Sequence, residues 1–138
     1  RVLYNAESGK FIGNLEAVAG NGKPNSESIF PTPNQPALTF PIDSPLGVAV
    51  SPSGEFLYVS DVFSPSSLYR VSLEADPRQN RIVRIAGRSE TGGAGDGDDA
   101  VNAQLYNPNT VQLDSSGTVL YIVDSRNHRI RRFTVANQ

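Results

Sequence analysis

PLGVAVSPSGEFLYVSD, residues 45–61, and PNTVQLDSSGTVLYIVD, residues 108–124, align without a gap at an offset of 63 residues. Each stretch has a short apolar run, a turn that contains Ser-Gly, and a second apolar run that ends at an aspartate. Short runs rich in β-branched and aromatic residues, bounded by turn residues, are typical of β-strands. The two stretches therefore predict the same β-hairpin, built twice.

The similarity between the two stretches extends in both directions. Downstream, Leu68–Val71 resembles Ile130–Phe133, and upstream Val18–Gly20 resembles Ile85–Gly87. Self-similarity at a fixed period is typical of repeat architectures, in which each unit buries its apolar face against a neighbouring unit. We therefore interpret the chain as about two units of one internal repeat.

The strand pattern divides the chain into three parts. Four short strands are expected over residues 46–86 and three over residues 109–135, with tight turns between them. Antiparallel units of four short strands are the blades of a β-propeller. We therefore expect the outer strands of a preceding blade in residues 1–20, a first repeat in residues 21–87 and a second repeat in residues 88–138.

Composition and charge narrow the class of protein. The 12 glycines and 10 prolines among 138 residues favour a turn-rich all-β fold over a helical bundle. A net charge of −2 gives no general attraction for nucleic acid. The sequence has no apolar run of about 18 residues, so no transmembrane helix and no membrane insertion are expected. Because cysteine is absent, disulfides and thiolate metal sites are excluded.

The second unit contains the longest ordered motif. Residues 85–133 read IAGRSETGGAGDGDDAVNAQLYNPNTVQLDSSGTVLYIVDSRNHRIRRF. This stretch resembles an NHL repeat almost throughout. The first unit resembles one less closely, because it lacks the Gly-Asp-Gly element and the Asn-His-Arg-Ile run. The resemblance covers residues 16–135 and implies an all-β fold, in which blades of four antiparallel strands form a ring of around six blades.

An incomplete ring follows from the strand count. The chain supplies about two to three blades, and such an array leaves strand edges and apolar blade faces open to water. We expect the chain to be a window on a longer propeller. The alternative is that several copies close the ring, and three copies would give six blades.

The function implied by the resemblance is binding. NHL propellers mostly bind proteins, RNA or surface ligands, and a minority are metal-dependent lyases. No nucleophile motif is present, and the single histidine, His128, cannot build a lyase-type metal site within this chain. We predict a non-catalytic interaction or scaffold module without a cofactor. Its predicted partners are proteins, glycans or other blades of the same or neighbouring chains, and an extracellular or cell-surface location is favoured. The alternatives are a metal-dependent lyase or lactonase propeller with ligands outside this chain, and an RNA-binding propeller.

Two loops carry candidate partner-binding residues. The proline-rich loop at residues 23–40 presents Ile29 and Phe30, and the turn after residue 61 presents Phe63. Apolar residues on loops often mark a contact with a partner. The alternative for Ile29 and Phe30 is that they fold onto their own blade.

Arginines form two groups, of which the second contains a further candidate, Arg126. The groups are Arg78, Arg81, Arg84 and Arg88, then Arg126, Arg129, Arg131 and Arg132. An RNA-binding face is one interpretation, with Tyr106 among the few aromatic residues nearby for base stacking. Solvated strand faces and salt bridges between blades are favoured, because acidic residues lie close to both groups.

Aspartates mark one glycine-rich loop and two strand ends. The loop at residues 92–99 contains Asp96, Asp98 and Asp99, whose carboxylates are candidate calcium ligands. A turn between blades is the favoured interpretation, because glycine permits positive φ and aspartate bonds its own backbone. Asp61 and Asp124 end equivalent strands, and we predict that both cap turns.

Overall fold

The computed structural model describes residues 3–5, 10–13, 15–63 and 65–135. Its strands are β1 (Leu3–Asn5), β2 (Lys10–Ile12), β3 (Gln35–Pro36), β4 (Pro45–Val50), β5 (Phe56–Asp61), β6 (Ser67–Ser72), β7 (Arg81–Ala86), β8 (Pro108–Leu113), β9 (Val119–Asp124) and β10 (Arg129–Thr134). Single 3-10 turns occur at η1 (Ala37–Thr39), η2 (Pro77–Gln79), η3 (Ala100–Asn102) and η4 (Ser125–Asn127). The described part of the chain has no α-helix, which confirms the predicted all-β class.

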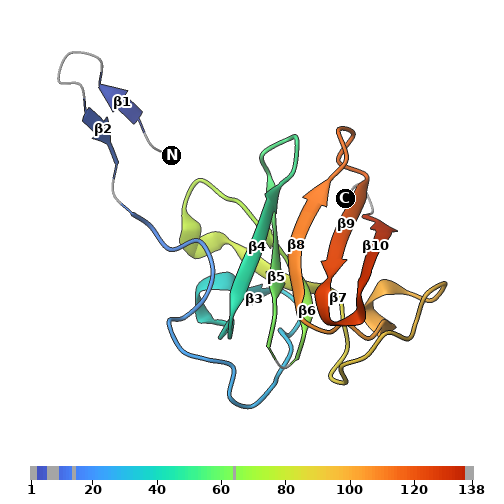
Figure 1. Ribbon diagram of the computed structural model, residues 1–138. Coiled ribbons are helices and arrows are strands. Elements are labelled where there is room, and N and C mark those ends of the chain that lie inside the picture. The colour runs from blue at the N-terminus through green and yellow to red at the C-terminus, as the bar shows by residue number, and fades with distance from the viewer. Residues whose placement is uncertain (1–2, 6–9, 14, 64, 136–138) are drawn as a thin grey trace.

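Two antiparallel sheets make up the body of the molecule (Figure 1). The larger has the order β3-β7-β6-β5-β4, and the smaller has the order β10-β9-β8. Neither sheet closes into a barrel, and the arrangement is consistent with part of a β-propeller. Strands β1 and β2 pair with each other in a separate two-stranded sheet.

The larger sheet has five strands, whereas the sequence predicted four. The additional strand, β3, comes from the proline-rich loop and pairs with β7 through Gln35–Ile82 and Pro36–Arg81. Proline has no backbone N–H to donate, so it is tolerated at the edge of a sheet, where Pro36 lies. Nothing in strand periodicity identifies a two-residue edge strand inside a loop, and the prediction missed it for that reason.

Strands and local contacts recur in the two units. Strand β8 begins 63 residues after β4, and β9 begins 63 residues after β5. The amide of Gly20 donates to the carbonyl of Ala37 at 2.9 Å, and the amide of Gly87 donates to the carbonyl of Ala100 at 3.1 Å. Both glycines have positive φ, 89° and 88°, a conformation that side chains disfavour.

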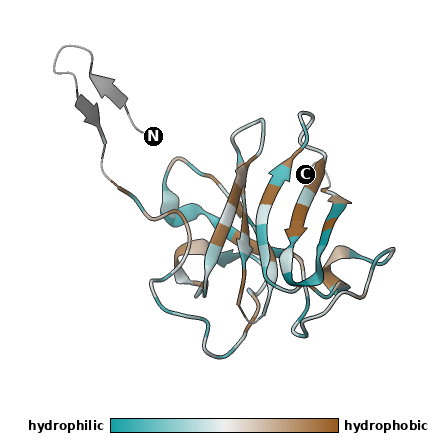
Figure 2. Cartoon of the chain, viewed as in Figure 1, coloured by the Kyte–Doolittle hydropathy of each residue, from teal (hydrophilic) through white to brown (hydrophobic). Residues whose placement is uncertain are grey.

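The inner strands β5 and β6 of the larger sheet are buried on both faces, because they carry apolar residues at successive positions. On one face Tyr58 and Leu68 pack in a cluster with Leu120 and Ile122 of the smaller sheet. On the other face the proline-rich segment covers the sheet. That second cluster consists of Ala37, Phe40, Val59, Tyr69, Val71 and Ile82. Figure 2 shows the apolar stretches on the strands of both sheets. Burying one such aliphatic or aromatic side chain contributes about 1.5–3 kcal/mol. The first cluster therefore holds the two sheets together, and the second holds the proline-rich segment on the larger sheet.

The sheets approach each other most closely where β4 meets β8. The hydroxyl of Ser60 accepts a hydrogen bond from the Gly47 amide at 2.9 Å and donates one to the Asn109 carbonyl at 3.0 Å. A Cβ added at Gly47 would lie 2.4 Å from that same carbonyl oxygen. The close approach therefore depends on glycine at position 47.

The strand-end aspartates bond to backbone amides of the loops before β4 and β8, and, contrary to the prediction, Asp124 makes no side-chain cap bond to η4, the turn that follows it. The Asp61 carboxylate accepts from the amides of Asp43 and Ser44 at 3.0 and 2.8 Å. The Asp124 carboxylate accepts from the amide of Tyr106 at 2.8 Å, which is the equivalent bond in the second unit. Both aspartates are buried, with 1% and 0% of their surface exposed.

The stabilities of Asp61→Asn and Asp114→Asn variants should depend on pH in opposite directions. Burial raises the pKa of Asp61, while hydrogen bonds from the Ser116 hydroxyl and nearby amides lower the pKa of Asp114. A raised pKa stabilises the fold below the unfolded-state pKa, and this contribution is lost as pH rises through the folded-state pKa. A lowered pKa stabilises the fold above the unfolded-state pKa, and this contribution is lost as pH falls.

The loss caused by Asp61→Asn should therefore be largest at acid pH, and the loss caused by Asp114→Asn should be largest near neutral pH. Urea unfolding of the wild type and both variants between about pH 3 and pH 7 measures both trends, since aspartate titrates near pH 4. Parallel trends in the two variants would contradict this prediction.

Candidate functional site

A groove of about 300 Å³ lies where loops of the two units meet. Its walls come from the turn after β5 and from the loops before β8 and after β9. The lining residues are Val62, Phe63, Ser66, Thr91, Tyr106, Asn107 and Arg126. Two aromatic residues at this groove are exposed to solvent. Phe63 is 59% exposed and Tyr106 is 43% exposed.

Hydrogen bonds fix the backbone on both sides of the groove. The Ser66 hydroxyl donates to the Val62 carbonyl at 3.1 Å and accepts from the Asn107 amide at 3.3 Å, so it joins the two walls. The Tyr106 carbonyl accepts from the Arg126 amide at 3.1 Å. Together with the bond from the Tyr106 amide to Asp124, this contact fixes the backbone of Tyr106 at both of its peptide groups.

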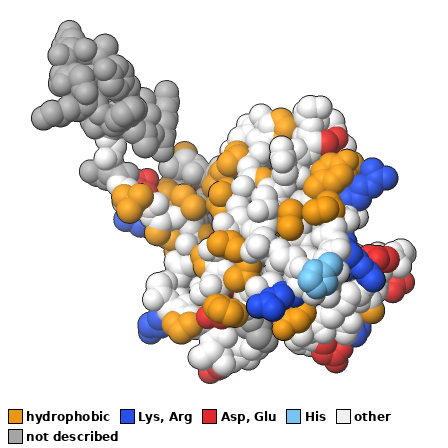
Figure 3. Space-filling model, viewed as in Figure 1, with side chains coloured by type: hydrophobic (Ala, Val, Ile, Leu, Met, Phe, Trp, Pro, Cys, Tyr) orange, Lys and Arg blue, Asp and Glu red, His pale blue; other side chains and the backbone are white. Residues whose placement is uncertain are grey.

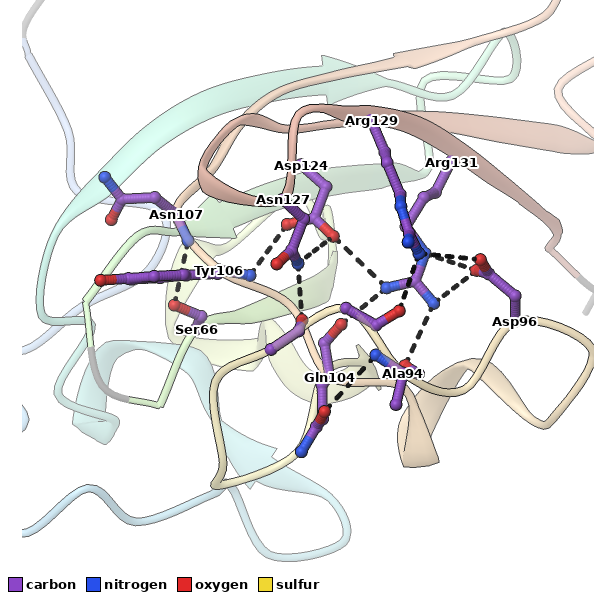
Figure 4. A network of polar contacts seen from close by, with 12 residues as sticks. Ser66, Ala94, Asp96, Gln104, Tyr106, Asn107, Asp124, Asn127, Arg129 and Arg131 are labelled. Atoms are coloured by element: carbon purple, nitrogen blue, oxygen red, sulfur yellow. Dashed lines mark hydrogen bonds and ion pairs between the residues drawn. The ribbon is translucent and has the colours of Figure 1, made fainter.

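A network of polar contacts lies beside the groove residues Tyr106, Ser66 and Asn107 (Figure 4). The buried Asp124 carboxylate accepts from the side chains of Asn127 at 2.7 Å and Arg131 at 3.3 Å. The Arg131 guanidinium, whose side chain is 9% exposed, also pairs with Asp96 at 2.7 Å and donates to the Gln104 carbonyl at 2.6 Å. The glycine-rich loop is thus tied to β10 and, through Asp124, to the groove.

The structure brings together two of the four predicted partner-binding residues. Phe63 and Arg126 line the groove, although 63 positions separate them in sequence. Ile29 and Phe30 are not among its lining residues. Phe30 is half-buried beneath the guanidinium of Arg84, which lies 4.0 Å from the ring centre. Ile29 is 42% exposed, and its backbone is bonded to the side chain of Asn25.

The sequence interpretation did not identify Ser66, Thr91 or Asn107 as groove residues. Asn107 has a φ of 55°, and the Asn107-Pro108 dipeptide was a turn signal that could have found it. Ser66 and Thr91 give no such signal. Their part in the groove depends on which loops pack together, and local patterns do not encode that.

The three candidate calcium ligands, Asp96, Asp98 and Asp99, have different surroundings. Asp96 faces two guanidinium groups, at 3.3 Å from Arg129 and 2.7 Å from Arg131. Asp98 and Asp99 are exposed and line a separate hollow between the sheets. Across residues 3–5, 10–13, 15–63 and 65–135, no group of three or more His, Cys, Asp or Glu side chains is placed to hold a metal ion. Calcium binding by this loop stays a prediction.

Several arginines of both groups are engaged within the chain. Arg81 donates to backbone carbonyls around η2, and Arg84 donates to the carbonyls of Gly87 and Val101. Arg88 pairs with Glu90 at 2.7 Å. These contacts use guanidinium donors that an RNA-binding face would need for phosphates.

No family model and no curated protein matches the chain. None of the helical turns in the described ranges is long and apolar enough to cross a membrane. What the groove binds is therefore inferred from its own side chains.

Proposed function

We propose that the chain is a non-catalytic binding module, an NHL-like propeller segment whose groove holds protein or glycan partners. The observation that carries this proposal is the pair of exposed rings, Phe63 and Tyr106, beside the exposed Arg126 on a hydrogen-bonded base. Aromatic residues and arginine are the types that most often dominate binding energy at interfaces. Tyrosine also presents a hydroxyl at the end of an apolar ring, so it can bond a partially hydrated partner.

Hydrogen bonds already order the backbone around the groove, so binding a partner should cost little conformational entropy. The groove walls are joined by the Ser66 hydroxyl, and Tyr106 is anchored through both of its peptide groups. A site that is already ordered loses less conformational entropy when a partner docks, so a larger part of the contact energy appears as affinity. With a volume of about 300 Å³, the groove suits one side chain of a protein partner or one sugar ring better than a large cofactor.

The chemistry of the lining residues indicates the kind of partner. Flat rings favour the apolar face of a sugar or an apolar side chain, and a guanidinium favours a carboxylate beside it. We propose a partner segment that combines an apolar or sugar face with an acidic group. Several arginines already bond to groups within the chain. This supports a module that binds proteins or glycans over an RNA-binding face.

Alanine at Phe63 or at Tyr106 should each weaken partner binding about tenfold or more, a loss of at least about 1.4 kcal/mol. A displayed peptide library and an array of acidic and neutral glycans, both probed with the 138-residue chain, would supply the ligand. Affinity for the selected peptide or glycan is then measured by titration calorimetry. Because both side chains are exposed, the variants should keep the stability of the wild type.

The matched control is Ile29→Ala, which shortens an exposed apolar side chain outside the groove. It should bind the selected ligand as the wild type does. Equal losses in all three variants would indicate nonspecific apolar binding. Unchanged affinity of the Phe63 and Tyr106 variants would overturn the assignment of the groove.

A further inference from the structure

The outer edge of β10 is unpaired among the described residues, whereas the equivalent edge of the larger sheet is covered. Strand β10 ends the order β10-β9-β8, but β6, its counterpart, pairs on its outer side with β7. The pairing of Asp124 with Arg129 and of Asp61 with Ser67 fixes this equivalence, so Arg132 corresponds to Arg70 and Phe133 to Val71. An open strand edge offers unpaired amides and carbonyls to any extended segment that reaches it.

A hollow of about 510 Å³ lies between the two sheets beside this edge. Phe133 and Val135 line it from the smaller sheet, and Tyr58, Val83 and Ile85 line it from the larger one. In the larger sheet, the β7 residue opposite Val71 is Ile82, which is 1% exposed. A strand added next to β10 would therefore place a side chain beside Phe133, at the hollow.

The chain contains a segment whose sequence resembles β7, the strand that pairs with the outer edge of β6. Residues 15–20 read LEAVAG and align with IVRIAG at residues 82–87. The amides of Gly20 and Gly87 make the same bond, each to the first residue of a 3-10 turn, η1 and η3. Leu15, at the position of the buried Ile82, is fully exposed.

The segment cannot reach β10 of its own chain from where it lies. The side chain of Asn80 donates to the Val18 carbonyl at 3.0 Å, and Gly20 is bonded to Ala37. Ala19 packs against the cluster on one face of the larger sheet, while Phe133 packs against the cluster on its opposite face. The whole larger sheet therefore separates the segment from the open edge.

We propose that residues 15–19 of one copy of this chain pair antiparallel with the outer edge of β10 of a second copy, and that copies so associate head to tail. The β6–β7 register, transferred to β10, sets Leu15 opposite Phe133, Glu16 opposite Arg132 and Ala19 opposite Ile130. Leu15 fills the hollow, and Glu16 and Arg132 form a cross-strand pair of opposite charge.

Apolar side chains at both ends of the body fit the same association. Leu46, Val48 and Val50 alternate along one face of β4 and are 59%, 62% and 54% exposed. Tyr121 and Ile130 share the outer face of the smaller sheet and are 40% and 67% exposed. Figure 3 shows apolar side chains reaching the surface in one view of the molecule. A contact between two different patches is heterologous, and copies joined in this way form a ring or a filament.

This association goes beyond the proposed partner binding, because it uses neither Phe63 nor Tyr106. It also differs from a two-fold dimer, in which one patch meets itself. Residues 15–19 and the outer edge of β10 lie on opposite faces of the larger sheet, so pairing between them would join two copies.

Disulfide trapping tests the pairing directly, because the chain has no cysteine of its own. A Glu16→Cys chain mixed with an Arg132→Cys chain under mild oxidation should give a covalent heterodimer, since residues opposite in a strand pair lie within disulfide reach. The control replaces Glu16→Cys by Ser53→Cys, which is exposed in the turn between β4 and β5. Crosslinking no faster than in this control would overturn the proposal.

Charge exchange gives an independent test in solution. Light scattering of the wild-type chain should show a mass above the 14.8 kDa of one copy. Glu16→Arg and Arg132→Glu should each weaken association about tenfold or more, and the double variant should restore it, because the pair of opposite charges is rebuilt. A wild type that is monomeric at all concentrations, or a double variant weaker than both single variants, would overturn the proposal. Ligand binding at the groove is measured separately, so failure here leaves that function standing.

Discussion

An Arg131→Met variant is expected to lose about 3–5 kcal/mol in its free energy of unfolding. Arg131 is 9% exposed at its side chain and pairs with Asp124, which is fully buried. Removing the guanidinium leaves the Asp124 carboxylate in a site of low polarity with only part of its former partners. Breaking a buried ion pair by removing one partner is costly because the remaining charge is no longer compensated.

The matched control is Arg129→Met, which removes the other cation of the same Asp96 carboxylate. The side chain of Arg129 is 51% exposed, so its loss should cost no more than about 1 kcal/mol. Urea unfolding measures both values. The double variant Asp124→Asn/Arg131→Met should lose less than the sum of the two single losses, since neutralising position 124 removes the unpaired charge. Equal losses in Arg131→Met and Arg129→Met would contradict the prediction.

The Arg131→Met substitution should also affect the groove. Asp124 accepts from Arg131 with one carboxylate oxygen and from the Tyr106 amide with the other. Once Arg131 is absent, the carboxylate is free to turn toward water, and the anchor of Tyr106 weakens. We therefore expect the amide of Tyr106 to exchange its hydrogen faster in Arg131→Met than in Arg129→Met.

Much of the fold could be predicted because it is encoded locally. The strand runs and their turns are set by apolar alternation and by Gly and Ser at fixed places. The equivalence of Asp61 and Asp124 followed from their position at the ends of equivalent strands, and both accept from equivalent loop amides. The pairing of Asp96 with Arg131 could not be predicted, because it joins residues 35 positions apart through the path of a glycine-rich loop.

Individual residues of the site could be predicted from the sequence, but their assembly at one groove could not. Phe63 was chosen as an apolar loop residue and Arg126 as a member of an arginine group, and the structure places both at one groove. Phe30 was chosen on the same grounds as Phe63, yet it is covered by the guanidinium of Arg84. An apolar residue in a loop has the same local pattern whether it meets a partner or its own chain. The difference is made by long-range packing.

A Gly47→Ala variant is expected to lose about 3 kcal/mol, because a single methyl group would force two sheets apart. The new Cβ would lie 2.4 Å from the Asn109 carbonyl oxygen and 2.9 Å from the Thr110 Cα. Both are backbone atoms of β8, so relief requires that the strand move rather than that a side chain rotate. The hydrogen bond from the Ser60 hydroxyl to the Asn109 carbonyl, now 3.0 Å long, would lengthen with that movement.

Gly93→Ala is the control, because its new Cβ would approach only the ends of two side chains, 3.4 Å from Asn127 and 3.5 Å from Arg129. Replacing a glycine where the backbone tolerates alanine usually stabilises a protein by about 0.4–1 kcal/mol, since the unfolded chain loses freedom. Thermal unfolding of both variants should therefore show shifts of opposite sign. If Gly47→Ala were as stable as the wild type, β4 and β8 would have to separate at little cost. The cluster of Tyr58, Leu120 and Ile122 would then hold the two sheets together without their close backbone contact.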